Sequence, residues 1–177
     1  MDDSVTVLRA NLPGTLPRLR RFARTLARNV TDADDLVQGA LERALSRAAQ
    51  WRAPPAGATP AQIEVAVRSW MFGIVKNAWI DSCRARSRER AVFAGDERIA
   101  AIADGSHGAM QDGLSVDAAM QHLPEEQRLA VALVLVEGLS YQEAADVMEV
   151  PVGTLTSRLS RGRETLAHLL GGPEAPR

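Results

Sequence analysis

The chain has 177 residues, of which 46% are hydrophobic and 24% charged, values typical of a soluble globular protein. This composition excludes a disordered chain and a collagen-like fibre. The 21 basic and 22 acidic side chains give a net charge of −1, which taken alone argues against a nucleic-acid partner. The charge is unevenly placed, because residues 1–90 carry +6 and residues 91–177 carry −7. This asymmetry predicts two modules with different surfaces.

Particular residues exclude further classes. A single cysteine, Cys83, allows no internal disulfide, which is consistent with the reducing cytoplasm. The three histidines lack the spacing of zinc ligands, so we expect no metal site and no cofactor. No apolar run approaches the roughly 20 residues of a membrane span, and the acidic N-terminus lacks a signal-peptide core. Aromatic residues are scarce and strand-like alternation is absent, so we expect an all-α protein.

Apolar residues at three- and four-residue steps predict a first helix from about Pro17 to Asn29. Thr31 is the expected N-cap of a second helix, with Asp34 three residues later in a near capping box. Gly39 inside this second helix costs about 1 kcal/mol relative to alanine, so close packing or mere drift must account for it.

Three prolines and a glycine in Arg52–Pro60 predict a loop. A third helix follows from Ile63 or Ser69 to Arg90. The next residues combine Gly, Ala, Ser and acidic side chains with weak periodicity, which is typical of a linker. The predicted organisation is two small helical domains and a linker between them: 1–90, 115–177 and 91–114.

The last third of the chain carries regular helix signals. Ser115 is an expected N-cap, and Pro124 fits the first turn of the next helix, which ends at Gly138. Ser140 and Glu143 form a capping box that predicts a short helix up to about Met148. Pro151 marks a turn before a final helix from about Val152 to Leu170.

Two helices separated by such a short turn predict a helix-turn-helix. On a helical wheel, one sector of the final helix is apolar and is expected to be buried: Val152, Leu155, Leu159, Gly162 and Leu166. Hydroxyl and arginine side chains on the other side suit the major groove of DNA, because they reach base edges and phosphates. These candidate residues are Thr154, Ser157, Arg158, Ser160, Arg161 and Arg163. An ordinary solvated helix in a bundle is the alternative.

The third helix carries two further patterns. Four arginines spaced by two surround its end with charge, which suits phosphate contacts as well as a solubilising surface: Arg84, Arg86, Arg88 and Arg90. Aromatic rings beside cations stack on unpaired bases, and an asparagine amide bonds to a base edge. This aromatic and polar set is Trp70, Phe72, Asn77 and Trp79. For either tryptophan taken singly, a core position is the favoured interpretation.

The acidic start of the second helix, residues 32–38, either caps the helix or presents carboxylates and apolar side chains to a basic protein partner. The sequence shows no Gly-rich phosphate loop, no Ser/His/Asp arrangement and no carboxylate pair in an expected pocket. We therefore do not expect an enzyme.

The chain resembles the bacterial sigma factors of the extracytoplasmic-function (ECF) group, in their minimal two-domain form. The segments that carry the resemblance are DADDLVQGALERAL, SWMFGIVKNAWIDSCRARSRE and LPEEQRLAVALVLVEGLSYQEAADVMEVPVGTLTSRLSRGRETL. They span about residues 16–90 and 115–170. The resemblance is specific because two motif blocks occur in the right order at the right separation.

The resemblance implies a cytoplasmic promoter-specificity subunit of bacterial RNA polymerase. Its first domain would bind the β′ clamp through the second helix, at Asp34, Asp35, Leu36, Gln38, Leu41 and Arg43. It would also melt and read the promoter −10 element, with Asn77 near a flipped base, through Arg68, Trp70, Asn77, Arg84, Arg86 and Arg88. The second domain would bind the β flap and place the final helix in the −35 element. The linker would thread toward the active-site and RNA-exit channels, and an anti-sigma factor would hold the protein inactive.

Two positions depart from the family pattern. Gly39 stands where an acid is common, and Thr156 stands where the recognition helix commonly has a basic residue. Other functions remain as alternatives: a helix-turn-helix regulator that acts without polymerase, a sigma-like decoy that binds an anti-sigma protein and not DNA, and an all-helical enzyme or scaffold. The first-domain motifs argue against the regulator, and the retained arginines argue against the decoy.

Overall fold

A computed structural model describes residues 3–93 and 115–171 of the chain. Within these ranges the chain is helical and has no strand, which confirms the all-α prediction. The first half consists of α1 (Asp3–Leu26), α2 (Val30–Ser46), the 3₁₀ turn η1 (Ala48–Gln50) and α3 (Pro60–Phe93). The second half consists of α4 (Val116–Gln121), α5 (Glu125–Val131), the π-helical segment η2 (Ala132–Val136), α6 (Tyr141–Met148) and α7 (Val152–Leu169). Most of the predicted linker, residues 94–114, lies outside the described residues.

Helix α1 begins at Asp3, so the predicted start near Pro17 was wrong. Leu8 and Leu12 in the added turns are buried in the core, although Pro13 and Pro17 lie inside the helix. Each proline removes one amide donor from the helical ladder. Burial of the two leucines outweighs that loss, which a local proline signal does not reveal.

The starts of α2 and α3 also differ from the prediction. The N-cap of α2 is Asn29 and not Thr31, because the Asn29 side chain accepts a hydrogen bond of 2.8 Å from the Asp32 amide. Helix α3 begins at Pro60, before either predicted start. Its first turn is held by Thr59 and Gln62, since the amide of each donates to the side-chain oxygen of the other.

In the second half, the predicted helix caps and the predicted helix-turn-helix are confirmed. Ser115 caps α4, and Ser140 and Glu143 form the complete capping box of α6. Gly138 adopts a φ of +70°, which a glycine reaches without steric cost. Helices α6 and α7 are separated by the three residues 149–151, so the helix-turn-helix is present.

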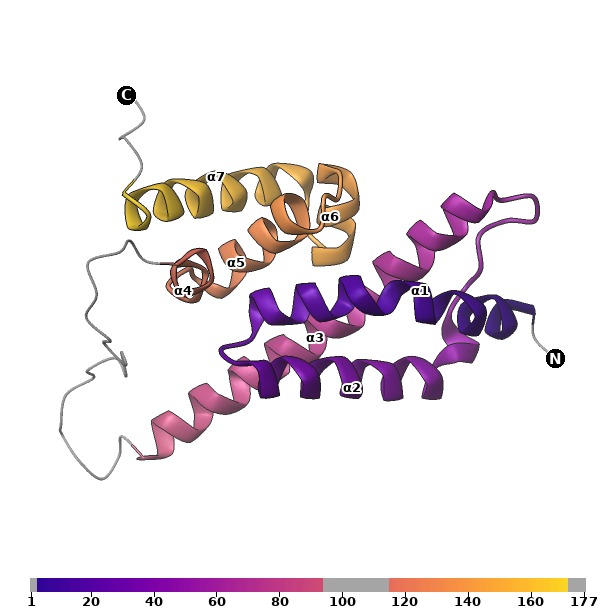
Figure 1. Ribbon diagram of the computed structural model, residues 1–177, viewed down its shortest axis with the longest axis horizontal. Coiled ribbons are helices and arrows are strands. Elements are labelled where there is room, and N and C mark those ends of the chain that lie inside the picture. Colours follow the sequence, from indigo (N-terminus) through magenta and orange to yellow (C-terminus); the bar gives the residue numbers. More distant parts are fainter. Residues whose placement is uncertain (1–2, 94–114, 172–177) are drawn as a thin grey trace.

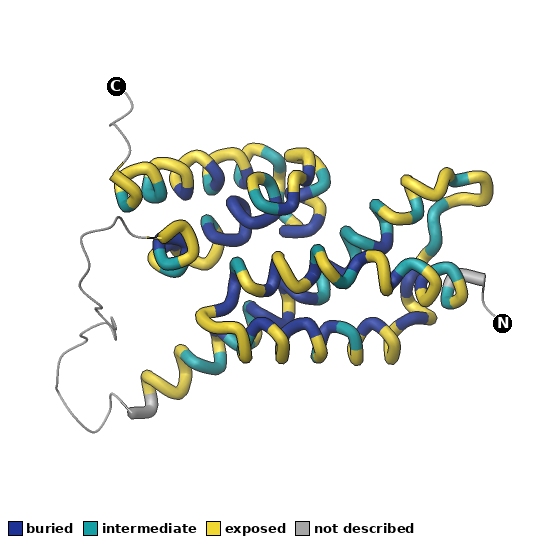
Figure 2. The backbone as a smooth tube through the Cα atoms, viewed as in Figure 1, coloured by how far each residue is buried: buried dark blue, intermediate teal, exposed yellow. Residues whose placement is uncertain are grey.

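The core continues from one half into the other. Phe22 and Phe72 pack with their ring centroids 4.8 Å apart in the first half, and Leu133, Leu155 and Leu159 are buried in the second. Helix α1 contacts α4 and η2, and α3 contacts α6. Figure 1 shows α4 to α7 lying against the group formed by α1 to α3, and Figure 2 marks buried residues in dark blue in both groups. The two halves of the described chain therefore pack against each other, and this packed state is the closed arrangement.

Candidate nucleic-acid and polymerase interface

The outer face of α7 presents the residues predicted to read the −35 element. Ser157, Ser160, Arg161 and Arg163 are exposed, while Leu155 (0% exposed) and Leu159 (2%) fill the core below them. The predicted buried stripe is thus confirmed at its centre. Its ends, Val152 and Leu166, are only partly buried. Because the stripe is buried, the hydroxyl and guanidinium groups of the opposite face point to solvent in the closed arrangement.

Three side chains on α7 already have partners within the chain. The Arg158 guanidinium lies 2.7 Å from a Glu126 carboxylate oxygen. The Ser160 hydroxyl donates to Glu164 (3.1 Å), and the Thr156 hydroxyl donates to the Val152 carbonyl (2.9 Å). Phosphate or base contacts by Arg158 therefore require exchange of a carboxylate partner.

Gly162 sets the distance between α7 and α5. A Cβ at this position would lie 2.8 Å from the Val131 Cγ2 methyl and 3.4 Å from the Gln127 backbone oxygen. The glycine thus allows the recognition helix to pack closely on α5, which explains why a residue with low helix propensity lies in its middle.

The residues predicted to contact the −10 element lie along α3 and have unlike surroundings. Asn77, Arg84 and Arg88 are exposed, and the Arg86 guanidinium donates to the Cys83 sulfur (3.1 Å). Arg68 lies about 30 Å from Arg88 along the helix, at 1.5 Å per residue. One helix therefore carries all of these residues, but they are spread too far along it to contact the same base.

The tryptophans have core roles to different degrees. Trp79 is buried (1% exposed), as expected for a core residue, whereas Trp70 is only partly buried and packs against the core. Trp70 is thus the tryptophan of α3 with exposed surface for stacking on a base.

Helix α2 presents most of the predicted polymerase contacts. Asp34, Asp35, Gln38 and Arg43 are exposed and Leu41 is half-buried. Leu36 is a core residue (8% exposed), so the structure assigns it to packing and not to this surface.

A hollow of about 220 Å³ lies between α2 and α3. Asp32, Asp35 and Arg43 line it from α2, and Ser82 and Arg86 line it from α3. A Cβ on Gly39 would meet nothing within 4 Å, so no close packing requires this glycine. The missing side chain instead contributes to the hollow, which joins the acidic face of α2 to the basic end of α3.

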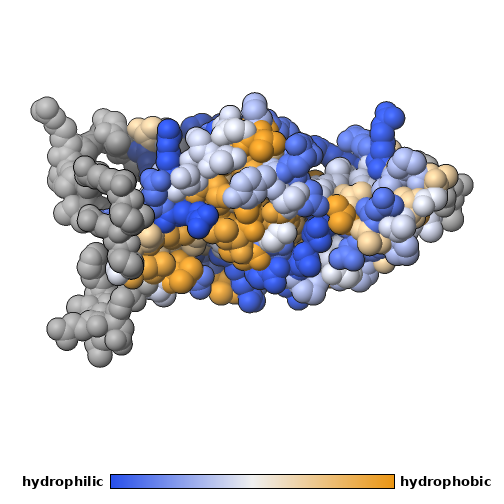
Figure 3. Space-filling model, turned by 90° about the horizontal axis from the view of Figure 1, so that it is seen from above, coloured by the Kyte–Doolittle hydropathy of each residue, from blue (hydrophilic) through white to orange (hydrophobic). Residues whose placement is uncertain are grey.

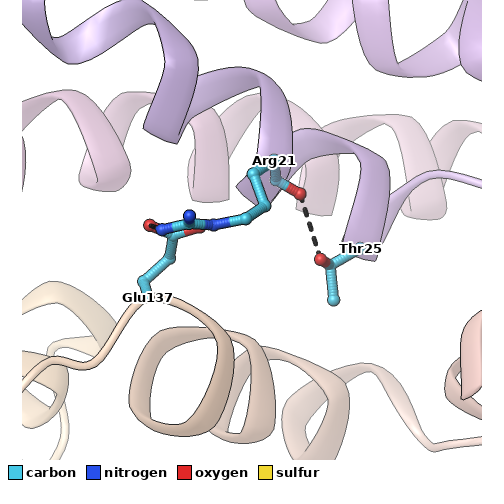
Figure 4. Close-up of polar contacts among 3 residues, drawn as sticks. All are labelled: Arg21, Thr25 and Glu137. Atoms are coloured by element: carbon cyan, nitrogen blue, oxygen red, sulfur yellow. Dashed lines mark hydrogen bonds and ion pairs between the residues drawn. The ribbon is translucent and has the colours of Figure 1, made fainter.

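Sequence reasoning missed the contacts between the two halves. Arg21 of α1 forms a bidentate pair with Glu137, with both N–O distances 2.8 Å (Figure 4). The Glu137 side chain is fully buried, whereas that of Arg21 is half exposed. The Arg21 pKa is raised because its guanidinium hydrogen-bonds to this carboxylate.

Arg128 is a second missed residue, and it inserts from α5 into the first half. Its guanidinium donates to the carbonyls of Leu26 (3.0 Å), Gln121 (2.8 Å) and Leu123 (3.1 Å), and it lies 5.7 Å from the centre of the Trp79 ring. Burial lowers the Arg128 pKa. The carbonyls at the ends of α1 and α4 thus solvate a cation that forms no ion pair with any carboxylate of the described residues.

Two pairs join α3 to α6 and the turn after it. The Lys76 ammonium lies 3.2 Å from Glu149, and the Arg68 guanidinium lies 3.8 Å from Glu143. Hydrogen bonds with Ser140 are the main cause of a lowered Glu143 pKa. The sequence signal available for Lys76 was its position one helical turn from Phe72, Trp79 and Ile80, which marks a cation expected to need a buried partner.

Comparison with known proteins assigns both halves to the same class. Residues 113–166 match the family model "Sigma-70, region 4", and residues 12–76 match "Sigma2 domain of PhyR". The chain is 34% identical to the ECF RNA polymerase sigma factor EcfG of Rhodopseudomonas palustris, over 92% of this chain and 84% of that protein. It is 35% identical to ECF sigma factor SigM of Mycobacterium tuberculosis, over 87% of this chain and 72% of that protein.

Solved structures agree with this assignment. The sigma factor RpoE of Bartonella quintana, in complex with the anti-sigma factor NepR, matches with a TM-score of 0.68 and 30% identity, over 92% of this chain and 96% of that chain. CnrH, solved with the cytosolic domain of CnrY, shares the fold with a TM-score of 0.62 and 21% identity, over 96% of this chain and 98% of that chain. Among the described helices, none is long and apolar enough to cross a membrane. The chain belongs to the ECF sigma factors of bacterial RNA polymerase.

Proposed function

We propose that the chain is the promoter-specificity subunit that directs bacterial RNA polymerase to a set of promoters and helps to open them. The observation that carries the proposal is the exposed face of α7, which lies opposite the buried apolar stripe and carries one serine and two arginines: Ser157, Arg161 and Arg163. Family membership supports the same role. The protein acts as an initiation factor and not as an enzyme, and it acts in the cytoplasm.

The two halves divide this work as separate domains, residues 1–90 and 115–177. The second domain reads the −35 element through Thr154, Ser157, Arg158, Ser160, Arg161 and Arg163. The first melts and reads the −10 element through Arg68, Trp70, Asn77, Arg84, Arg86 and Arg88. Opening a duplex costs free energy, and capture of an unstacked base offsets part of it.

The polymerase core binds both domains, with the β′ clamp on the exposed face of α2 and the β flap on the second domain. The α2 contacts are Asp34, Asp35, Gln38, Leu41 and Arg43. Holding two weak DNA readers on one polymerase raises their effective concentration, so neither needs high affinity alone.

An anti-sigma factor is the expected regulatory partner. The RpoE relative was solved with the anti-sigma factor NepR, and CnrH was solved with a domain of CnrY. A protein that binds across both halves of this chain would hold them together and keep the polymerase from α2.

A decoy is the second candidate, because the model that matches residues 12–76 is the sigma2 domain of PhyR. PhyR of Bartonella quintana, described as an anti-anti-sigma factor, shares the fold with a TM-score of 0.55 at 19% identity, and this chain covers 49% of it. A decoy needs to bind an anti-sigma protein and does not need a DNA-reading face on α7.

Run-off transcription with core polymerase on a promoter library separates these functions. The sigma factor initiates at a defined set of promoters, Arg161→Ala impairs −35 recognition, and Asn77→Ala impairs opening more than closed-complex binding. Absence of initiation with active core, together with absence of co-purification with polymerase, would contradict the proposal. Equal loss in the binding and opening assays for both variants would contradict the division of labour.

A further inference from the structure

Among the described residues, three ion pairs join the two halves, and all three have the same polarity. In each pair the cation belongs to the first half and the carboxylate to the second: Arg21–Glu137, Arg68–Glu143 and Lys76–Glu149. The second half thus uses part of its excess acid against the basic half of its own chain. Two of the three cations, Arg68 and Lys76, lie on α3, the helix that would contact the −10 element.

Lys76 is almost completely covered in this arrangement. Its side chain is 4% exposed, and its Nζ lies 3.2 Å from a Glu149 carboxylate whose side chain is 75% exposed. Glu149 adopts a φ of +58° at the end of α6, a conformation in which glycine is the usual residue. A carboxylate is present there despite an unfavourable backbone conformation, and its described ion pair is with Lys76.

Arg68 is held less completely. Its side chain is 12% exposed, and the nearest carboxylate oxygen of Glu143 is 3.8 Å away. Its buried Nε has no acceptor among the described residues. The other Glu143 oxygen accepts from the Ser140 amide, so this carboxylate is shared between two tasks. A phosphate, which accepts two parallel hydrogen bonds from a guanidinium, would satisfy Arg68 better.

We propose that Arg68 and Lys76 form a phosphate-binding pair on α3, and that Glu143 and Glu149 occupy this pair in the closed chain as internal competitors of DNA. The two cations are eight residues apart, about 12 Å along the helix. DNA binding at this pair therefore requires α6 to move away. The inference rests on the proposed function for the role of α3, and it adds Lys76 to the predicted DNA contacts.

Cys83 provides an internal reporter of opening. This single cysteine is 8% exposed, and its pKa is raised to about 11, chiefly by burial and also by the neighbouring Glu125 carboxylate of the second half. Its thiolate is scarce at neutral pH, so a thiol reagent reacts slowly with the closed chain. Separation of the halves hydrates Cys83 and speeds that reaction.

The test compares Glu143→Gln/Glu149→Gln with the wild-type full chain. Glutamine at 143 keeps the capping box, because its amide oxygen still accepts from the Ser140 amide. The control variant, Glu42→Gln/Asp146→Asn, removes the same charge from two exposed carboxylates, each of which accepts a hydrogen bond from a glutamine on its own helix. Binding is measured by the fluorescence anisotropy of a labelled single-stranded oligonucleotide of random sequence, and opening by the rate of Cys83 modification.

We expect the double variant to bind the oligonucleotide about tenfold more tightly at low salt. The slope of log affinity against log salt concentration should become steeper by about 1.4, because two side chains, Arg68 and Lys76, become free to contact phosphates of a single strand. We also expect faster Cys83 modification. The control stays within twofold of the wild type in both assays. Adding Lys76→Gln to the double variant removes most of the gain in affinity.

Three results would overturn the inference: affinity no higher than in the control, a gain that survives Lys76→Gln, or faster Cys83 modification without a gain in affinity. Glu149→Gly is a second variant that removes a carboxylate while relieving the backbone, and it should shift both readouts in the same direction. The proposed function is tested separately, because a wild-type chain that fails to support transcription contradicts that function even if the oligonucleotide results are as expected.

Discussion

At the residue scale, Arg128 is a charged side chain that is buried between the two halves. Its charge is buried, and its two terminal nitrogens donate to three backbone carbonyls and to the Gln121 side-chain oxygen, whereas its buried Nε has no acceptor among the described residues. We expect Arg128→Met, which keeps similar bulk but removes the donors, to lower the free energy of unfolding by about 2 kcal/mol. Urea denaturation followed by circular dichroism measures this loss. Arg161→Ala, a change at an exposed position of α7, should cost less than about 0.5 kcal/mol, and an equal cost would contradict the role of Arg128.

Two glycines in helices are predicted to respond in opposite directions. Gly39→Ala should raise the free energy of unfolding by about 0.5 to 1 kcal/mol, because the site is open and alanine is the better helix former. Gly162→Ala should lower it by about 1 to 2 kcal/mol, because the new Cβ would lie 2.8 Å from the Val131 methyl. Thermal and urea unfolding of both variants measure the difference. Stabilisation by both would show that α7 can move away from α5 at little cost.

At the element scale, the capping box of α6 links helix stability to pH. We expect Ser140→Ala to lower the free energy of unfolding by about 1 kcal/mol near neutral pH. Hydrogen bonds with Ser140 hold the Glu143 pKa below its ordinary value of 4.5. A carboxylate with a lowered pKa stabilises the fold above its unfolded-state pKa, and this contribution is lost as the pH falls through the folded-state pKa.

The difference between Ser140→Ala and wild type should therefore shrink as the pH falls below 4.5, which urea unfolding at several pH values measures. Ser115→Ala is the matched control, because the Ser115 hydroxyl caps α4 by accepting from the Ala118 amide without a carboxylate. A constant difference for Ser140→Ala across this range would contradict the coupling.

Helix starts show what local signals miss at this scale. Ser115 and Ser140 were identifiable because each hydroxyl accepts from the backbone amide three residues later. The start of α1 could not be identified from the sequence, because it depends on burial of Leu8 and Leu12 by helices distant in sequence.

At the scale of the whole molecule, we expect the placement of charge along the chain to govern DNA binding. The net charge of −1 and the pairing between the halves should keep the free protein from binding random duplex DNA at sub-micromolar affinity in physiological salt. Titration of a labelled random duplex, read by anisotropy, measures this. A tighter interaction would contradict this account of the charge balance.

The second half also exposes apolar side chains to solvent. Val116 and Leu135 of the second half are more than half exposed. A groove beside them is lined by Arg20, Arg21 and Arg24 of α1 and by Val131 below. The face seen in Figure 3 carries apolar surface next to strongly hydrophilic surface.

The sequence by itself determined the helical class, the capping signals of the second half, the helix-turn-helix and the family. Each depends on residues within a few positions of one another, or on motifs kept in order along the chain. The candidate residues of α7 follow from the same periodicity, since burial of Leu155 and Leu159 forces the opposite face outward.

Only the tertiary structure decided which charges meet. It placed Leu36 in the core, Arg128 against the end of α1, and Lys76 beside Glu149. These contacts join residues far apart in sequence, and their energies depend on burial and distance, which no local pattern encodes. For the same reason no local pattern showed that part of the −7 charge of the second half lies against the first half of the same chain.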